Sequence, residues 1–329
     1  MASRVGWVAP ADRMSPRDCV ALATAADAAG FCGVLAADTF QPWLPSLGQA
    51  PFVWNLLSAI GEHTGGDIVA GMAVAGYRLH PAVLAQAAAT LAALHHGRVW
   101  ISLAPGESIH EHITGLHIPE APERIDRMFE ALELVQKLFS ASRDAKSTRF
   151  HGAHFTMEAA RVWTMPPTLP QIVIATSGPT TARRAGRVAD GIMVLGTSVS
   201  RAEALLDRFR DGAEASGRDA DSLRRVAYMN VSWAPDRTAA RQAALARFPM
   251  AAMRFAHGDL RSPHTIEQIA RLVRAEDLGD GVLVTDDAGE IRAAIASLLG
   301  AGFQQVYLNN VADNHAEFLH MAVDSLLPQ

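Results

Sequence analysis

Short apolar runs alternate along the chain with longer segments in which apolar residues recur at helical spacing. Most of the short runs are nearly continuous rather than alternating, which is typical of parallel strands buried on both faces. Residues 99–104 and 172–175 are the clearest examples. The predicted strands are 4–9, 33–37, 68–74, 98–104, 171–176, 191–196, 226–233 and 304–309.

Helical patterns separate these runs. In residues 123–139, apolar side chains fall on one face of a helix. Ser15 and Pro16 open the first helix with a cap residue and a first-turn proline, and Gly30 closes it. Further helices are predicted at 81–94, 179–189, 200–217, 236–248, 287–300 and 315–327. Eight strands that alternate with helices predict an α/β fold, the (β/α)8 or TIM barrel, with an open doubly wound sheet as the alternative.

The length of 329 residues fits a single barrel domain over 1–329. Two stretches, at about 140–170 and 250–285, do not follow the repeat, and we interpret them as insertions on the barrel. The first contains a short hairpin pattern at 149–157, and the second contains an apolar run at 282–285. Long loops in a compact domain are usually lids or binding loops.

Composition and charge exclude several classes of function. Hydrophobic residues make up 49% of the chain and charged residues 19%, which allows a large core and argues against disorder. The net charge of −5 argues against a nucleic-acid partner, because phosphate binding needs clustered Lys and Arg. Lys137 and Lys146, the two lysines, are not at strand ends, so no Schiff-base residue is indicated.

Cysteine usage and the lack of targeting patterns indicate the compartment. Cys19 and Cys32 have no CxxC spacing, so we expect reduced thiols and no disulfide scaffold. We see no signal-peptide pattern and no apolar stretch long enough to span a bilayer. The expectation is a cytoplasmic protein with no membrane partner.

The most informative chemistry follows the second predicted strand. This buried run ends abruptly in Asp38, Thr39, Gln41 and Trp43, and Pro42 prevents it from continuing as a central strand. A carboxylate, a hydroxyl, an amide and an indole at one strand end are typical of a ligand pocket. In a barrel, the carboxyl ends of the strands face the active site.

Glu107 is the best candidate for acid–base work. It follows an apolar strand and Gly106, so burial would raise its pKa and let it hold a proton near neutral pH. The structural alternative is that Glu107 caps the next helix or pairs with an arginine.

Two other motifs are less specific. Residues 176–179, Thr-Ser-Gly-Pro, stand between a strand and a helix, where backbone N–H groups and hydroxyls can hold a phosphate, although such a run is also a plain helix start. His110, Glu111 and His112 resemble metal ligands, but residues two apart do not share a helix face, so we predict no metal site.

Taken in order, these residues resemble a known family, the coenzyme F420-dependent glucose-6-phosphate dehydrogenase group of the bacterial-luciferase-like superfamily. The likeness covers nearly the whole chain and is strongest over residues 1–195. It is carried by Asp38-x-Phe40-Gln41-Pro42-Trp43, Ala50-Pro51-Phe52, Gly61-Glu62-x-Thr64, His80-Pro81-Ala82-Val83-x-Ala85-Gln86, Gly106-Glu107 and Ser177-Gly178-Pro179.

The resemblance implies a barrel that binds F420, a deazaflavin, and acts as a homodimer. It implies that the Glu107 carboxylate handles a proton at the deazaflavin ring and that Thr39, Gln41 and Trp43 lie on the substrate side. It also implies a strained non-prolyl cis peptide at Ala73–Val74. The cofactor-binding residues that it implies are Asp38, Ala73, Val74, Gly106, Glu107, His110, Ala175, Thr176, Ser177 and Gly178.

Two departures from the family pattern argue against glucose 6-phosphate as the substrate. The family has a histidine base where this chain has Thr39, and a threonine hydroxyl is a poor base at neutral pH. The family also binds the sugar phosphate with basic residues, whereas residues 195–200 contain no lysine and 277–281 are acidic. Arg254 and Arg261 could supply that charge, but no spacing requires it.

The sequence therefore predicts an F420-dependent oxidoreductase that transfers hydride between the deazaflavin and an unphosphorylated alcohol, ketone, enone or imine, with reduction favoured. A luciferase-like monooxygenase that uses FMN is the rival enzyme. A non-catalytic deazaflavin-binding protein is the rival from another class.

Overall fold

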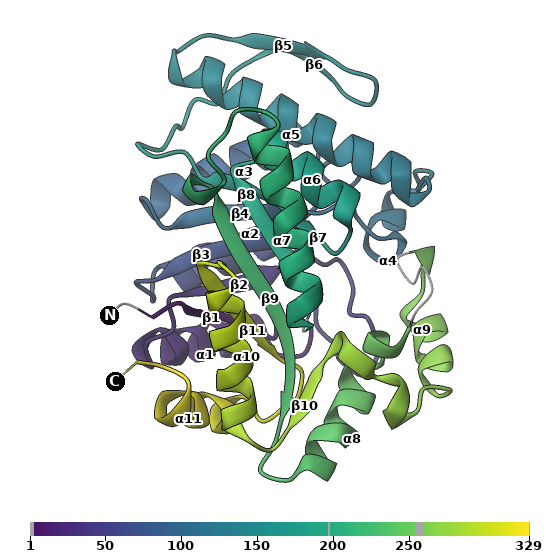
Figure 1. Cartoon of the computed structure of the whole chain (residues 1–329). Coiled ribbons are helices and arrows are strands. Elements are labelled where there is room, and N and C mark those ends of the chain that lie inside the picture. The colour runs from purple at the N-terminus through teal and green to yellow at the C-terminus, as the bar shows by residue number, and fades with distance from the viewer. Residues whose placement is uncertain (1–2, 197, 254–258, 329) are drawn as a thin grey trace.

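The computed structural model describes residues 3–196, 198–253 and 259–328. Within these residues, eight parallel strands close into a barrel, because β9 pairs with β8 on one side and with β11 on the other (Figure 1). The closed ring confirms the predicted (β/α)8 barrel and excludes the open sheet. Around the ring the strands are β1 (Val5–Val8), β2 (Gly33–Ala37), β3 (Asp67–Ala73), β4 (Val99–Leu103), β7 (Gln171–Thr176), β8 (Gly191–Leu195), β9 (Arg224–Trp233) and β11 (Gln305–Asn310).

Helices surround the strands (Figure 1). Most begin where the sequence predicts, since Pro16, Pro81 and Pro179 each occupy a first-turn position. The pattern does not predict α4, which is one turn long, or α9, which lies in the 250–285 segment. The helices are α1 (Pro16–Ala28), α2 (Val53–Gly61), α3 (Pro81–Leu94), α4 (Ser108–Glu111), α5 (Ala121–Arg143), α6 (Pro179–Val188), α7 (Val199–Glu214), α8 (Arg237–Arg247), α9 (Pro263–Ala270), α10 (Ala288–Gly300) and α11 (His315–Ser325).

Three strands lie outside the ring. β5 (Thr148–His151) and β6 (Thr156–Ala160) form an antiparallel hairpin beside α5 (Figure 1). The Glu130 carboxylate on α5 accepts hydrogen bonds from three backbone N–H groups of the hairpin turn, at 2.7–3.0 Å. β10 (Leu283–Thr285) pairs with the last residues of β9, which extends beyond the ring.

The half of the barrel interior toward the amino ends of the strands is filled by side chains. Residues from all eight strands pack there, and the rings of Trp100 and Tyr307 meet edge to face at 5.7 Å from opposite sides of the ring. Gly6 makes room for Tyr307, since a Cβ at Gly6 would lie 2.4 Å from the ring. At the amino end, the Asp67 carboxylate accepts hydrogen bonds from Trp100 and Arg224. Within the described barrel interior, space for a ligand therefore lies toward the carboxyl ends of the strands.

Cys19 and Cys32 are free thiols, and burial raises the pKa of each to about 12. None of the helices in the described ranges is long and apolar enough to cross a membrane.

Candidate functional site

A cavity of about 1070 Å³ lies at the carboxyl ends of the strands. Its size is at the upper end of the range for small-molecule sites, so a cofactor and a small substrate fit together. Every strand of the ring contributes to the wall through its last residues or the loop that follows. Representative lining residues in ring order are Pro10, Asp38, Val74, Glu107, Ser177, Gly196, Asn230 and Asn309.

The site residues predicted from the sequence all line this cavity except Ala73, which is fully buried in β3. The parallel ring explains this convergence, because it brings the carboxyl ends of all its strands to one face. The predicted residues in the wall are Asp38, Thr39, Gln41, Trp43, Val74, Gly106, Glu107, His110, Ala175, Thr176, Ser177 and Gly178.

The end of β3 differs from the expectation. Every peptide bond in the described part of the chain is trans, so the implied cis peptide at Ala73–Val74 is wrong. The chain turns one residue earlier, where Met72 has a φ of 50° and the register with β4 shifts between Ala70 and Ala73. The Met72 N–H donates to Ser102 Oγ at 2.8 Å. A non-glycine residue in this region costs about 1–3 kcal/mol, so its neighbours hold it there.

Glu107 stands at the start of α4 and faces the cavity. Burial raises the pKa of its carboxyl to about 7; Arg124 opposes the shift and Glu111 adds to it. About 38% of the side chain is accessible, but that surface belongs to the cavity wall. Glu107 makes no side-chain cap to α4 and no ion pair with an arginine among the described residues; its Oε2 lies 4.0 Å from Nε2 of His110. Neither structural alternative for Glu107 is therefore seen.

Gly106 fixes the direction in which Glu107 leaves β4. Its φ of 86° lies in the left-handed region, and a Cβ would come within 2.9 Å of Val74 Cγ1. Only glycine fits this turn without strain.

His110 is a neutral imidazole in the wall. Burial, together with Arg78 and His112, lowers its pKa to about 3. The Trp43 ring meets it edge to face at 5.4 Å. Within the described ranges, no group of three His, Cys, Asp or Glu side chains could hold a metal ion.

Asp38 belongs to a buried ion triad that sequence reasoning missed. Arg78, from the loop after β3, places Nη1 3.1 Å from Asp38 Oδ1 and Nε 2.9 Å from Glu111 Oε1. All three side chains are at most 8% exposed. Arg78 follows a strand end as the other candidates do, which is the signal that could have drawn attention to it.

The loop between β7 and α6 has the features of a phosphate site. Thr176 Oγ1 accepts a hydrogen bond from the Gly178 N–H at 3.0 Å, which shapes the turn before Pro179. Arg201 on α7 donates from Nη2 to the Ser177 carbonyl at 3.2 Å and also lines the cavity. Arg201 therefore adds positive charge beside the start of α6.

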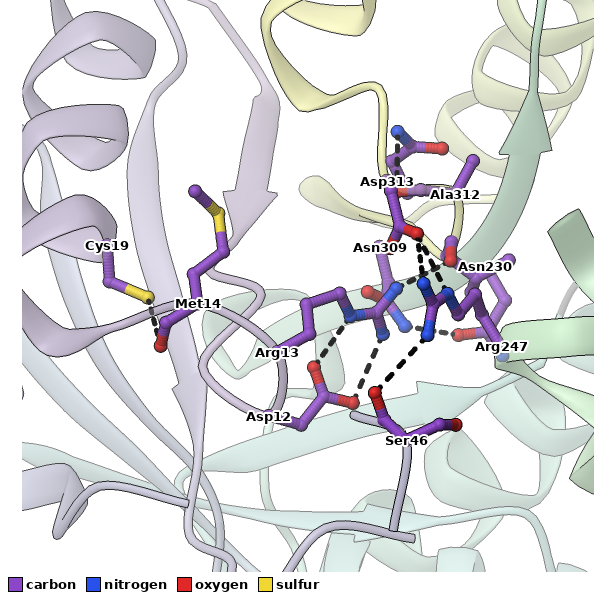
Figure 2. Close-up of polar contacts among 12 residues, drawn as sticks. Asp12, Arg13, Met14, Cys19, Ser46, Asn230, Arg247, Asn309, Ala312 and Asp313 are labelled. Carbon is purple, nitrogen blue, oxygen red and sulfur yellow. Dashed lines mark hydrogen bonds and ion pairs between the residues drawn. The ribbon is translucent and has the colours of Figure 1, made fainter. Parts of the chain in front are cut away.

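Polar side chains at or after the ends of β1, β9 and β11 line one part of the cavity, and Figure 2 shows the contacts among them. The Arg13 guanidinium contacts both carboxylate oxygens of Asp12, at 2.8 and 3.1 Å. Asn309 Nδ2 donates to Asn230 Oδ1 at 2.9 Å, and Asn230 Nδ2 donates to the Gly281 carbonyl at 3.2 Å. Sequence reasoning missed these residues because they read as ordinary strand-end polar side chains.

The loop after β2 is tied to its neighbours by Gln41, whose Nε2 donates to the Ile109 and Arg261 carbonyls. Arg261 itself lines a separate cavity of about 360 Å³ and is not in the main wall. Arg254, the other arginine considered from the sequence, and Thr197 lie outside the described residues.

Comparison with known proteins agrees with the predicted resemblance. Residues 3–317 match the family described as luciferase-like monooxygenase. The chain is 32% identical over 335 residues to the F420-dependent glucose-6-phosphate dehydrogenase of Nakamurella multipartita, which covers 99% of this chain and 96% of that protein. It is 31% identical over 330 residues to the enzyme of the same name from Beutenbergia cavernae, with 99% and 97% covered.

A similar solved structure is that of an F420-dependent secondary alcohol dehydrogenase in complex with an F420-acetone adduct. It superposes with a TM-score of 0.91 at 24% identity and covers 99% of this chain and 98% of that one, which shows the shared fold. The match over residues 3–317, the closed barrel and the two full-length relatives give one conclusion: the chain belongs to the luciferase-like monooxygenase family, among relatives that are F420-dependent dehydrogenases.

Proposed function

We propose that this protein is an F420-dependent oxidoreductase that reduces an unphosphorylated ketone, enone or imine. The observation that carries the proposal is one cavity that holds the Glu107 carboxyl, the buried Asp38 carboxylate and the Ser177–Gly178 turn. Relatives 28–32% identical over nearly the whole chain are named F420-dependent glucose-6-phosphate dehydrogenases, which supports the cofactor.

The described residues fit a phosphorylated deazaflavin. Asp38 Oδ2 is buried and has no hydrogen-bond partner among the described residues, so it can accept a hydrogen bond from a ring N–H. Ser177, Gly178 and Arg201 offer a hydroxyl, a helix start and a guanidinium to a phosphate. When bound, F420 supplies two-electron hydride chemistry.

Glu107 is the residue that would hold and deliver the proton. A pKa of about 7 leaves both its protonated and its ionised forms populated at neutral pH. His110 and Thr39, which also line the cavity, are poor bases, the first because burial lowers its pKa to about 3 and the second because a hydroxyl is hard to deprotonate. Among the described residues of the wall, Glu107 can therefore hold the proton, and no histidine base accompanies it as in the family pattern, which favours reduction.

The wall opposite Glu107 favours an uncharged substrate. Among the described residues, the guanidinium groups in the wall are those of Arg13 and Arg201. Asp12 balances the charge of Arg13, and Arg201 stands at the phosphate turn of the cofactor. The Asn230–Asn309 amide pair offers hydrogen bonds without charge. A sugar phosphate would find no uncompensated cation at this end of the described wall.

The test compares carbonyl reduction with alcohol oxidation by the purified protein. The absorbance of the cofactor measures the rate of each reaction. Reduced F420 with small ketones, enones and imines should turn over faster than oxidised F420 with the matching alcohols. Glucose 6-phosphate should be no better than unphosphorylated alcohols of similar size. Faster alcohol oxidation would refute the direction, and efficient use of glucose 6-phosphate would refute the substrate class.

Three expectations from the sequence remain predictions. The homodimer is tested by light scattering across a concentration series. The cytoplasmic location is tested by fractionation of the source cells. The single barrel domain with insertions at about 140–170 and 250–285 is tested by calorimetry, where one cooperative transition is expected.

A further inference from the structure

We propose that Arg78 is a positioning residue that holds the Asp38 carboxylate in the orientation that receives the F420 ring. This inference rests on the proposed function, because it concerns how the cavity binds that cofactor. Arg78 does not itself line the cavity.

Arg78 uses its whole side chain to hold two buried carboxylates. Nη1 donates to Asp38 Oδ1 at 3.1 Å, Nη2 donates to the Asp38 backbone carbonyl at 3.3 Å, and Nε donates to Glu111 Oε1 at 2.9 Å. The Arg78 backbone N–H also approaches Glu111 Oε2, at 3.4 Å. The side chain of Asp38 is 1% exposed and that of Glu111 is 0% exposed.

These contacts leave one oxygen of Asp38 without a hydrogen-bond partner. Oδ1 and the main-chain carbonyl are both engaged by the same guanidinium, which fixes the rotation of the carboxylate about its side-chain bonds. Oδ2 is buried without a partner among the described residues, although Asp38 is part of the cavity wall. An unpartnered buried acceptor needs an explanation, and we assign it here to a donor on the bound cofactor.

The planar fork of arginine is essential to this arrangement. It meets Asp38 and Glu111 in three directions at once, whereas a lysine ammonium is a point charge that keeps the attraction and loses the geometry. Glu111 is the last residue of α4, and Glu107 directly precedes this helix. Arg78 therefore also links Asp38 to the segment that carries Glu107.

The test is a double-mutant cycle on the full-length protein, with R78K, D38N and the combined variant. F420 is titrated into each, and Kd is read from the absorbance of the cofactor. R78K should weaken binding about tenfold, which corresponds to the loss of a well-placed hydrogen bond to a charged group. Because Arg78 acts through Asp38, the combined variant should bind no more than about twofold weaker than D38N alone.

R98K is the matched control. Arg98 also holds several groups through its guanidinium, including the Gly61 and Gly66 carbonyls, but it stands before β4, at the opposite end of the barrel from the cavity. R98K should lower the melting temperature and leave the Kd for F420 unchanged. If R78K does not fold, E111Q replaces it in the cycle, because it removes the charge that anchors Arg78; it should weaken F420 binding in the wild-type background and have little effect in the D38N background.

The outcomes separate this inference from the proposed function. If the wild-type protein does not bind F420, both the proposed function and the role of Arg78 are overturned. If the wild type binds F420 but the effects of R78K and D38N on Kd are additive, only the inference about Arg78 is overturned. The same follows if R98K loses as much affinity for F420 as R78K does.

Discussion

Replacing Glu107 by Gln removes the cavity carboxyl whose pKa burial raises to about 7. At that pKa about half of the groups carry a proton at pH 7, whereas at the ordinary value of 4.5 about 0.3% would. The cavity thus increases the proton-donating form on the order of a hundredfold. Donation by a positioned side chain accelerates a reaction by about 10²–10⁴-fold, and we expect E107Q to slow carbonyl reduction by a factor in that range.

The pH dependence of the wild-type rate follows from the same pKa. Reduction should slow as the pH rises through about 7, because the protonated carboxyl is lost. E107Q should lack this limb, since a carboxamide does not titrate.

Stability gives a readout that needs no substrate. The folded protein binds this proton more tightly than the unfolded chain does, so the free energy of unfolding falls as the pH rises from about 4.5 through about 7. E107Q avoids the cost of the buried charge. The difference in melting temperature between E107Q and the wild type should therefore increase, in favour of E107Q, as the pH rises across this window. At higher pH the difference should stay constant.

Thermal melts in a buffer series from pH 4.5 to about 8.5 measure the difference, and stopped-flow reduction measures the rate. Glu62→Gln, at an exposed position after α2, controls for the loss of one carboxyl. A melting-temperature difference between E107Q and wild type that does not change with pH would refute the reasoning. So would an E107Q rate that still falls through pH 7.

Three further predictions concern the turn, the thiols and the substrate side. Gly106→Ala should lower stability by about 1–3 kcal/mol in urea unfolding, because its φ of 86° and the contact with Val74 exclude a Cβ; unchanged stability would count against the turn as described. With pKa values of about 12, Cys19 and Cys32 should resist iodoacetamide at pH 8 in the native state and react after denaturation, as mass spectrometry would show; rapid native labelling would contradict their burial. Thr39→His should raise alcohol oxidation relative to carbonyl reduction by supplying a base, and an unchanged ratio of the two rates would argue against the role assigned to Thr39.

Much of the fold could be predicted from the sequence, because a parallel barrel buries both faces of its strands. That burial requires continuous apolar runs, such as 99–104 and 172–175, and these runs are visible without any structure. Once the barrel is predicted, the meeting of Asp38, Glu107 and Ser177 at one face follows from the geometry of parallel strands.

The rest of the site depends on contacts that no local pattern encodes. Arg78 and Glu111 are 33 positions apart, and no local pattern around either residue predicts that they meet in the buried triad with Asp38. The cis peptide expected at Ala73–Val74 rested on the resemblance to the family and is wrong here: the peptide is trans, and the strained backbone lies at Met72, where the register of β3 with β4 shifts. The 250–285 segment has no clean period, since α9 and β10 pack mainly through neighbouring loops and β9.

Titration of the purified protein with F420, and in parallel with FMN, tests the central claim most directly. We propose that Asp38, Glu107 and the Ser177–Gly178 turn surround one deazaflavin. F420 should therefore bind to saturation and raise the melting temperature of the protein by mass action. FMN at the same concentration should shift it far less. A shift with FMN and none with F420 would contradict the account.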